Sequence, residues 1–156
     1  MKPKLLAAAL GILLLAAVGS AQASEQVRCE VLTIEASNSG QGIDPALMAH
    51  VSIFQKAPFS SFNTFRLVSR TSYKLELGKP VALSMPTPLT GVLTFNRLLE
   101  GRLDLTLSIN RTTAPPILIN GRATPGSPFF AAGLKSARGR WVFGIVCDRA
   151  DSIIQH

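Results

Sequence analysis

The 156-residue sequence is short of the residues on which most enzymes depend. It has two histidines, and only 16% of its residues are charged and 6% aromatic. It contains no Gly-x-Ser-x-Gly elbow, no glycine-rich phosphate loop and no His-Glu-x-x-His motif. His50 falls inside a predicted helix and His156 is the last residue. We therefore expect no catalytic triad, no metal site and no cofactor.

Other shortages exclude whole classes of protein. The length excludes a large multi-domain enzyme, and a hydrophobic content of 47% excludes a disordered chain. The two cysteines exclude a disulfide-dense scaffold, but Cys29 and Cys147 lie near the two ends of the expected domain. In an oxidising compartment they are expected to form a disulfide, the alternative being two buried free thiols.

Long apolar runs are absent apart from one at the N-terminus. Lys2 and Lys4 precede an apolar stretch from Leu5 to Val18, and a small-residue segment with Ala21 and Ala23 follows. This pattern predicts a signal peptide over residues 1–23, too short for a transmembrane helix. It would leave a single β-rich domain over residues 24–149, a frayed tail over 150–156, and no membrane span. The predicted location is the periplasm or the exterior of the cell.

The rest of the chain alternates with the period of β-strands. Leu103, Leu105, Leu107 and Ile109 are separated by polar residues, and residues 27–36 are apolar on both faces. Asp44-Pro45 opens one predicted helix over about 44–56. Asn120-Gly121 reads as a tight turn after a strand over 114–120. We expect a mainly β (α+β) fold, an antiparallel sandwich or curled sheet of about seven or eight short strands covered by a helix.

Four short segments follow one another along the expected domain: residues 42–47 (GIDPAL), 57–62 (APFSSF), 128–133 (PFFAAG) and 144–147 (GIVC). Together they resemble a family of small exported bacterial proteins with no assigned function. The order and spacing of these segments carry the resemblance over most of the expected mature chain. It implies export and a shared β-rich domain, and it provides no catalytic residues.

Positive charge is concentrated in one part of the chain. Residues 91–140 contain two acidic and seven basic residues, and the basic ones are Arg97, Arg102, Arg111, Arg122, Lys135, Arg138 and Arg140. Arginine suits bidentate contact with carboxylates or phosphates, so these residues are candidates for binding an anionic lipid headgroup or an acidic glycan. The alternative is ordinary solvated charge. Nucleic acid is not an expected partner, because no basic run is interleaved with aromatics.

A cluster of phenylalanines and one glutamate provide two further candidate sites. Phe59, Phe62 and Phe65 form either an exposed docking site for a protein or a plug between helix and sheet. Glu35, next to a glycine-containing loop, is the best single candidate for a catalytic carboxylate.

These features give three functional hypotheses. The first is a non-enzymatic envelope module that binds or assembles with another envelope or extracellular protein. The second is a binder of anionic ligands through residues 91–140, and the third is a small carboxylate-based hydrolase.

Overall fold

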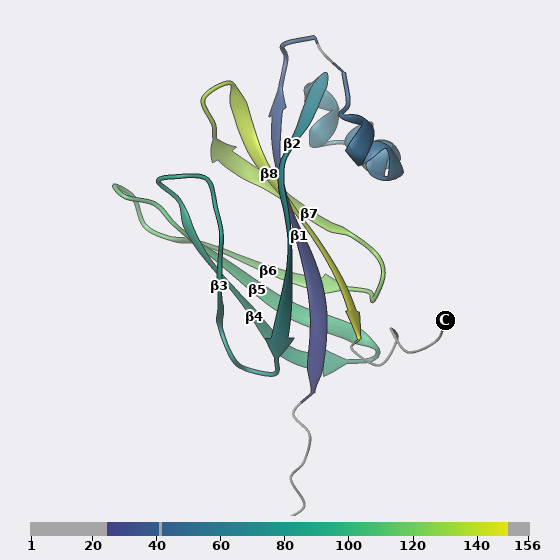
Figure 1. Cartoon of the computed structure of the whole chain (residues 1–156), viewed down its shortest axis with the longest axis vertical. Helices are drawn as coiled ribbons and strands as arrows, with labels where there is room; N and C mark the ends of the chain where they lie inside the picture. Colours follow the sequence, from purple (N-terminus) through teal and green to yellow (C-terminus); the bar gives the residue numbers. More distant parts are fainter. Residues whose placement is uncertain (1–24, 41, 150–156) are drawn as a thin grey trace, which may run out of the picture.

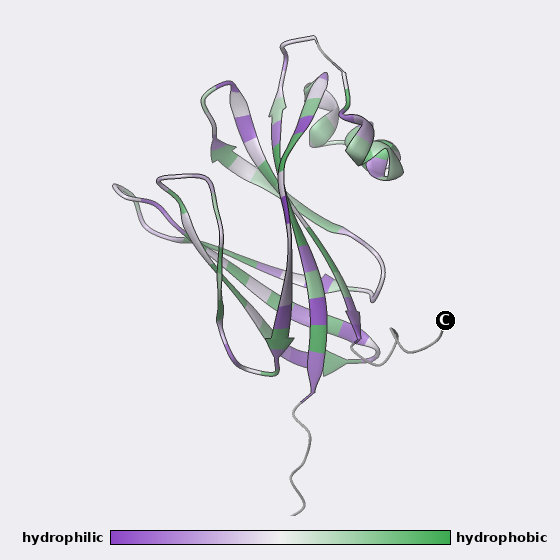
Figure 2. Ribbon diagram, viewed as in Figure 1, coloured by the Kyte–Doolittle hydropathy of each residue, from purple (hydrophilic) through white to green (hydrophobic). Residues whose placement is uncertain are grey.

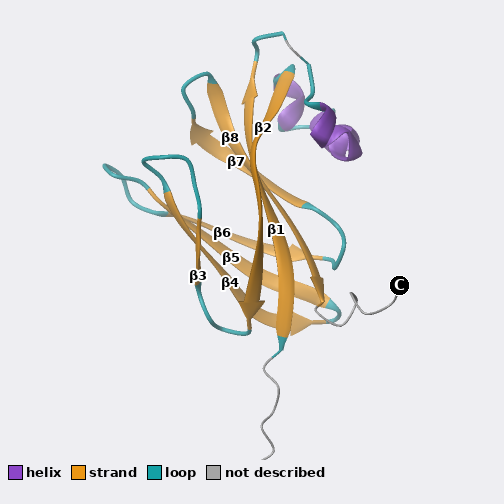
Figure 3. Cartoon of the chain, viewed as in Figure 1, coloured by secondary structure: helices purple, strands orange, loops and turns teal. Residues whose placement is uncertain are grey.

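A computed structural model describes residues 25–40 and 42–149, which form two four-stranded antiparallel sheets (Figures 1 and 3). The first sheet has the order β2 (Thr64–Glu76), β1 (Gln26–Ser37), β8 (Gly139–Arg149) and β7 (Phe129–Lys135). The second has the order β3 (Val81–Leu83), β4 (Thr90–Leu99), β5 (Arg102–Asn110) and β6 (Ile117–Ala123). This confirms the mainly β fold. The predicted signal peptide (1–23) and tail (150–156) lie outside the described residues.

The main core lies between the two sheets. On β5, Leu103, Leu105, Leu107 and Ile109 are all buried, and the residues between them are not. Figure 2 shows the same alternation of apolar and polar residues on neighbouring strands. Because successive side chains of a strand point to opposite faces, the period of two in the sequence defines the inner face of the sheet.

A second core covers the outer face of the first sheet. Leu32, Ile34 and Ala36 of β1 pack there, beneath the helical segment that follows the strand. This segment contains η1 (Pro45–His50), α1 (Val51–Phe54) and η2 (Phe59–Ser61). The strand β1 therefore has apolar neighbours on both faces, which explains why residues 27–36 lack strict alternation.

The helix predicted over 44–56 is shorter and more irregular than expected. Asp44 is its N-cap, as predicted, and its Oδ1 accepts a hydrogen bond from the Ala46 amide at 2.9 Å. The first six residues are 3-10 helix, and α-helix continues only to Phe54. In a 3-10 helix residues i and i+3 share a face. Leu47 and His50 therefore lie on the same face: Leu47 is buried, and the ring of His50 contacts the ring of Phe130.

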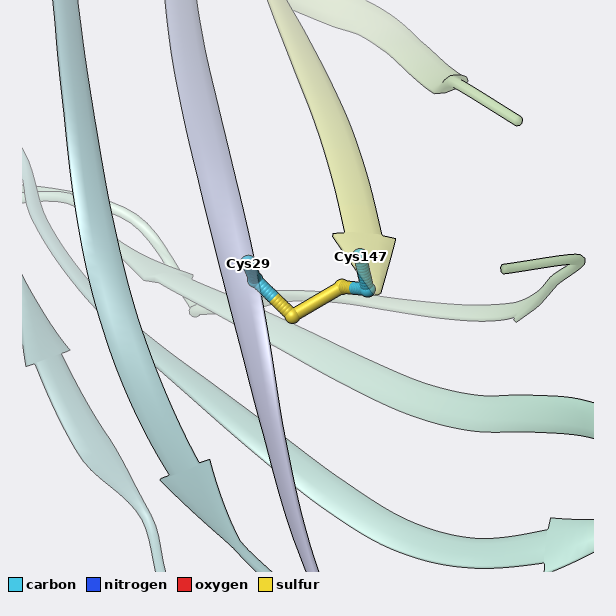
Figure 4. Close-up of a disulfide and its surroundings, with 2 residues drawn as sticks. All are labelled: Cys29 and Cys147. Atoms are coloured by element: carbon cyan, nitrogen blue, oxygen red, sulfur yellow. A yellow bond between two sulfur atoms is a disulfide. The ribbon is translucent and has the colours of Figure 1, made fainter. Parts of the chain in front are cut away.

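The predicted disulfide is confirmed (Figure 4). Cys29 on β1 and Cys147 on β8 are directly opposite each other, with a Cα–Cα distance of 4.0 Å. The bond joins residues 118 apart in the sequence but adjacent in the sheet. It therefore ties the first strand of the domain to the last.

The predicted turn at Asn120-Gly121 is wrong, and the predicted strand over 114–120 begins and ends later. Both residues lie within β6, where Asn120 pairs with Thr106 and Gly121 with Leu105. A Cβ at Gly121 would be 2.8 Å from Cζ of Phe129. The glycine serves close packing of an aromatic ring against the strand, and this requirement is not visible in the local sequence.

Candidate functional site

The main candidate site in the described part of the chain is a cleft at one end of the sandwich, where the two sheets diverge. In Figure 1 the β3–β4 and β5–β6 loops and the β7–β8 turn all lie on the left-hand side of the molecule. The cleft has a volume of about 640 Å³. Its lining residues come from both sheets and their loops: Pro88, Leu89, Arg111, Thr112, Thr113, Ile117, Gly133, Leu134, Lys135, Arg140 and Trp141. Volumes of this size are typical of small-molecule sites.

Three of the seven predicted basic residues line this cleft: Arg111, Lys135 and Arg140. The guanidinium of Arg111 donates to the Pro115 carbonyl from both Nε (3.1 Å) and Nη2 (2.6 Å). That of Arg140 donates from Nη1 to the Gly133 carbonyl at 2.8 Å. These bonds hold the two guanidinium groups in place and leave their positive charge intact.

The charge at the cleft has no acidic counterpart in the described part of the chain. None of the described residues that line the cleft is acidic. The ion pairs among the described residues do not include Arg111, Lys135 or Arg140. Lys135 and Arg140 are moreover a directly opposed cross-strand pair on β7 and β8. Two like charges in that position repel each other, so a bound anion would stabilise the pair.

The floor of the cleft is apolar and continuous with the main core. Leu134 is buried, and Leu89, Ile117 and Trp141 are partly buried and pack against the core between the sheets. Leu134 and Trp141 are themselves a cross-strand pair, next to the Lys135–Arg140 pair. The lining of the cleft thus includes both apolar side chains and cations that form no ion pair with a described carboxylate.

The other four predicted basic residues lie elsewhere. Arg97 and Arg122 flank Asp104, at 2.6 Å and 3.1 Å from its carboxylate oxygens. The hydrogen bond from Arg97 and the charges of both arginines hold the pKa of Asp104 below its ordinary value, against a smaller opposing effect of burial. Arg102 is exposed at the start of β5, and Arg138 is exposed in the β7–β8 turn. The seven basic residues thus do not form one rim.

Glu35 lines a separate, smaller pocket of about 260 Å³. Its side chain is only 6% exposed, and Nη2 of Arg66 is 2.9 Å from Oε2. Burial raises the pKa of Glu35, but hydrogen bonds from Ser136, Arg66 and the Arg138 amide, with the charge of Arg66, outweigh it and lower the pKa overall. Glu35 is therefore an ionised carboxylate that links β1 to β2 and to the β7–β8 turn.

Asp44 lines the same pocket, but its carboxylate is already engaged. Oδ1 accepts from the Ala46 amide, and Oδ2 accepts from the Leu67 amide at 3.2 Å. Oδ1 thus caps the start of the helical segment, and Oδ2 anchors it to β2. The pKa of Glu35 is lowered, whereas a general acid requires a raised one.

The candidate docking segment is mostly interior. Phe59 and Phe65 are buried and Phe62 is partly buried, all in the second core. The ring of Phe65 stacks on that of Phe54, with centroids 4.4 Å apart. Of the two interpretations of this segment, the structure favours the plug between helix and sheet.

The four segments that carried the family resemblance meet in and around the second core. Leu47, Phe59, Phe130 and Gly144 come from these four segments, and the first three contribute to this core. Phe130 is opposite Gly144 in the β7–β8 ladder. The segments are thus explained by packing between the helical elements and the first sheet.

Within residues 25–40 and 42–149, no group of three or more His, Cys, Asp or Glu residues is placed to hold a metal ion. No helix in the same part of the chain has the length and apolar character needed to cross a membrane.

Comparison of the chain with protein-family models, curated proteins and solved structures finds no match. The assignment of the candidate site therefore rests on the geometry of this structure alone. Sequence reasoning found three basic residues of the cleft but missed its apolar floor. The side chains of Trp141 and Leu134 pack toward the core between the sheets, and the tertiary structure places them in the lining of the cleft.

Proposed function

We propose that this protein is an exported, non-enzymatic binding module of the bacterial envelope that takes an anionic ligand in the cleft between its two sheets. One observation carries the proposal: Arg111, Lys135 and Arg140 line an apolar-floored cleft with no acidic side chain among the described lining residues. Arginine and lysine recognise carboxylates and phosphates through charge-assisted hydrogen bonds.

Export rests on two independent features. The N-terminal pattern over residues 1–23 has the basic, apolar and small-residue parts of a signal peptide. The disulfide between Cys29 and Cys147 is typical of proteins in oxidising compartments. Together they support a location in the periplasm or outside the cell.

The two rival functions have weaker support. A protein–protein assembly module would have used the phenylalanine segment as its anchor, but Phe59 and Phe65 are buried. A hydrolase would require one of two carboxylates to be a proton donor, and Glu35 instead has a lowered pKa and an arginine partner. By contrast, the basic side chains of the cleft are accessible, and none of them forms an ion pair with a described carboxylate.

The test is anion binding by a charge-reversed cleft. Wild-type protein and Lys135→Glu/Arg140→Glu are titrated, at low and high salt, with short alkyl carboxylates, an acidic polysaccharide and vesicles containing phosphatidylglycerol. We expect at least one of these anions to bind, and the double variant to bind it at least about tenfold more weakly, because two charge-assisted contacts are lost. High salt should weaken binding to the wild type as well.

A matched control carries the same change in net charge outside the cleft. Lys74 and Arg102 are both exposed and are absent from the cleft lining. Lys74→Glu/Arg102→Glu should therefore retain wild-type affinity. Failure of every anion to bind, or equal weakening by both double variants, would refute the proposed function.

A further inference from the structure

The cleft contains an apolar surface as well as charged residues. A purely ionic ligand would contact only the charged residues. The pair Lys135–Arg140 is immediately followed in the β7–β8 ladder by the pair Leu134–Trp141. Lys135 and Arg140 are exposed, whereas Leu134 is buried and Trp141 is partly buried. Successive residues of a strand point to opposite faces, but all four residues line the cleft, so a ligand there can contact both the cations and the apolar side chains.

This apolar surface is larger than one side chain. Leu89 from the β3–β4 loop and Ile117 from β6 line the same cleft and are also partly exposed. They belong to the second sheet, so the floor is formed by side chains from both sheets. Covering such a surface is favourable in proportion to the apolar area removed from water. An inorganic anion or a sugar acid would leave it in contact with solvent.

We infer that the ligand is amphipathic, a single alkyl chain that ends in a carboxylate or phosphate. The anionic group lies between Lys135 and Arg140 with Arg111 nearby, and the chain lies over Trp141, Leu89 and Ile117. This inference rests on the proposed function and adds the chemical class of the ligand. A free amphiphile fits better than a membrane surface, because the apolar residues line a concavity and do not protrude.

The single tryptophan of the chain makes the inference directly measurable. Trp141 is the only tryptophan and it lines the cleft, so its fluorescence reports on occupancy. We propose titration with hexanoate, octanoate and decanoate below their micelle concentrations. Burial of each added methylene should tighten binding by about fourfold, so each two-carbon step should lower the Kd by roughly an order of magnitude. Calorimetry repeats the titration without depending on fluorescence.

Two comparisons separate the head group from the chain. The alcohol of the same length should bind at least about tenfold more weakly than the carboxylate, because it cannot form the ionic contacts. Lys135→Gln/Arg140→Gln should remove this difference by weakening only the carboxylate. Lys74→Gln/Arg102→Gln is the control that should leave both affinities unchanged. Both double variants change only exposed residues, so both proteins should retain the wild-type melting temperature.

The outcomes distinguish the inference from the proposed function. An affinity that is independent of chain length, or equal for alcohol and carboxylate, overturns the amphipathic ligand. Binding of an acidic polysaccharide that depends on Lys135 and Arg140, without any response to alkyl carboxylates, overturns it and leaves the proposed function standing. Binding to phosphatidylglycerol vesicles without binding of monomeric carboxylates has the same meaning. Absence of binding to every anion refutes both.

Discussion

The ring of Phe130 covers Gly144 on the neighbouring strand so closely that a Cβ at the glycine would be 2.6 Å from Cε1 of the ring. The two residues are directly opposite each other in the β7–β8 ladder. Phe130 also makes edge contacts with the rings of His50, Phe54 and Phe59, so it cannot move aside freely. This glycine–aromatic pair is a junction between the first sheet and the helical segment that covers it.

The junction predicts that Gly144→Ala destabilises the protein. The added methyl group must displace a packed aromatic ring, and overpacking of this kind costs about 1–3 kcal/mol in the free energy of unfolding. Denaturant titration measures the loss. In a Phe130→Ala background the same glycine substitution should cost much less, because the obstructing ring is gone. Equal costs in the two backgrounds would show that the ring is not the cause.

The Glu35–Arg66 pair predicts a defined dependence of stability on pH. Because the pKa of Glu35 is lowered in the folded state, the unfolded chain takes up its proton first as the pH falls. The stabilisation is therefore present above the unfolded-state pKa of about 4.3 and disappears as the pH falls through the folded-state value. Glu35→Gln removes the titrating group. The difference in unfolding free energy between wild type and this variant should be largest at neutral pH.

That difference should shrink toward zero as the pH falls below the unfolded-state pKa of about 4.3 and through the lower folded-state value. At neutral pH we expect it to be about 1–3 kcal/mol, the usual effect of weakening a buried, charge-assisted hydrogen bond. Denaturant titrations of both proteins across this range provide the measurement. A difference that stays constant with pH would mean that Glu35 does not contribute through its charge.

The disulfide between Cys29 and Cys147 predicts a large loss of stability on removal. It closes a loop between residues separated by 118 positions, and loops of that length correspond to roughly 4–5 kcal/mol in the chain-entropy model. Replacing both cysteines with serine, and separately reducing the wild type, should lower the melting temperature to a similar extent. The prediction fails if reductant leaves the melting temperature of the wild type unchanged.

The inner face of β5 predicts a sharp contrast between two positions on the same strand. Leu105→Asp places an uncompensated charge in the core between the sheets, where the leucine is 3% exposed, and should prevent folding. Ser108 lies on the other face of the strand and is only partly buried. Ser108→Asp should fold with nearly wild-type stability. Circular dichroism and thermal melting of the two variants provide the comparison, and a folded Leu105→Asp protein would contradict the assigned face.

Sequence patterns predicted those elements whose determinants are local. The alternation from Arg102 to Asn110 predicts β5 and its inner face, because side chains of a strand alternate whatever the rest of the fold does. The cap at Asp44 follows from the chemistry of one carboxylate and a nearby amide. The disulfide followed from a different argument, since only two cysteines are present to pair.

Predictions failed where a distant residue decides the local structure. Asn120-Gly121 has the chemistry of a tight turn, but the ring of Phe129 needs the glycine within β6. The helix over 44–56 is interrupted because its residues must meet the outer face of β1 and the rings around Phe130. In both places tertiary packing outweighs the intrinsic preference of the segment.

The sequence alone determined that this chain is a β-rich domain with one disulfide, and that its middle region is basic. The tertiary structure alone decided that Arg111, Lys135 and Arg140 meet beside Trp141, while Arg97 and Arg122 pair with Asp104 on another part of the surface. The physical reason is the range of the interactions involved. Alternation and charge are properties of neighbouring residues, whereas a cleft depends on which strand ends and loops are brought together by the packing of two sheets.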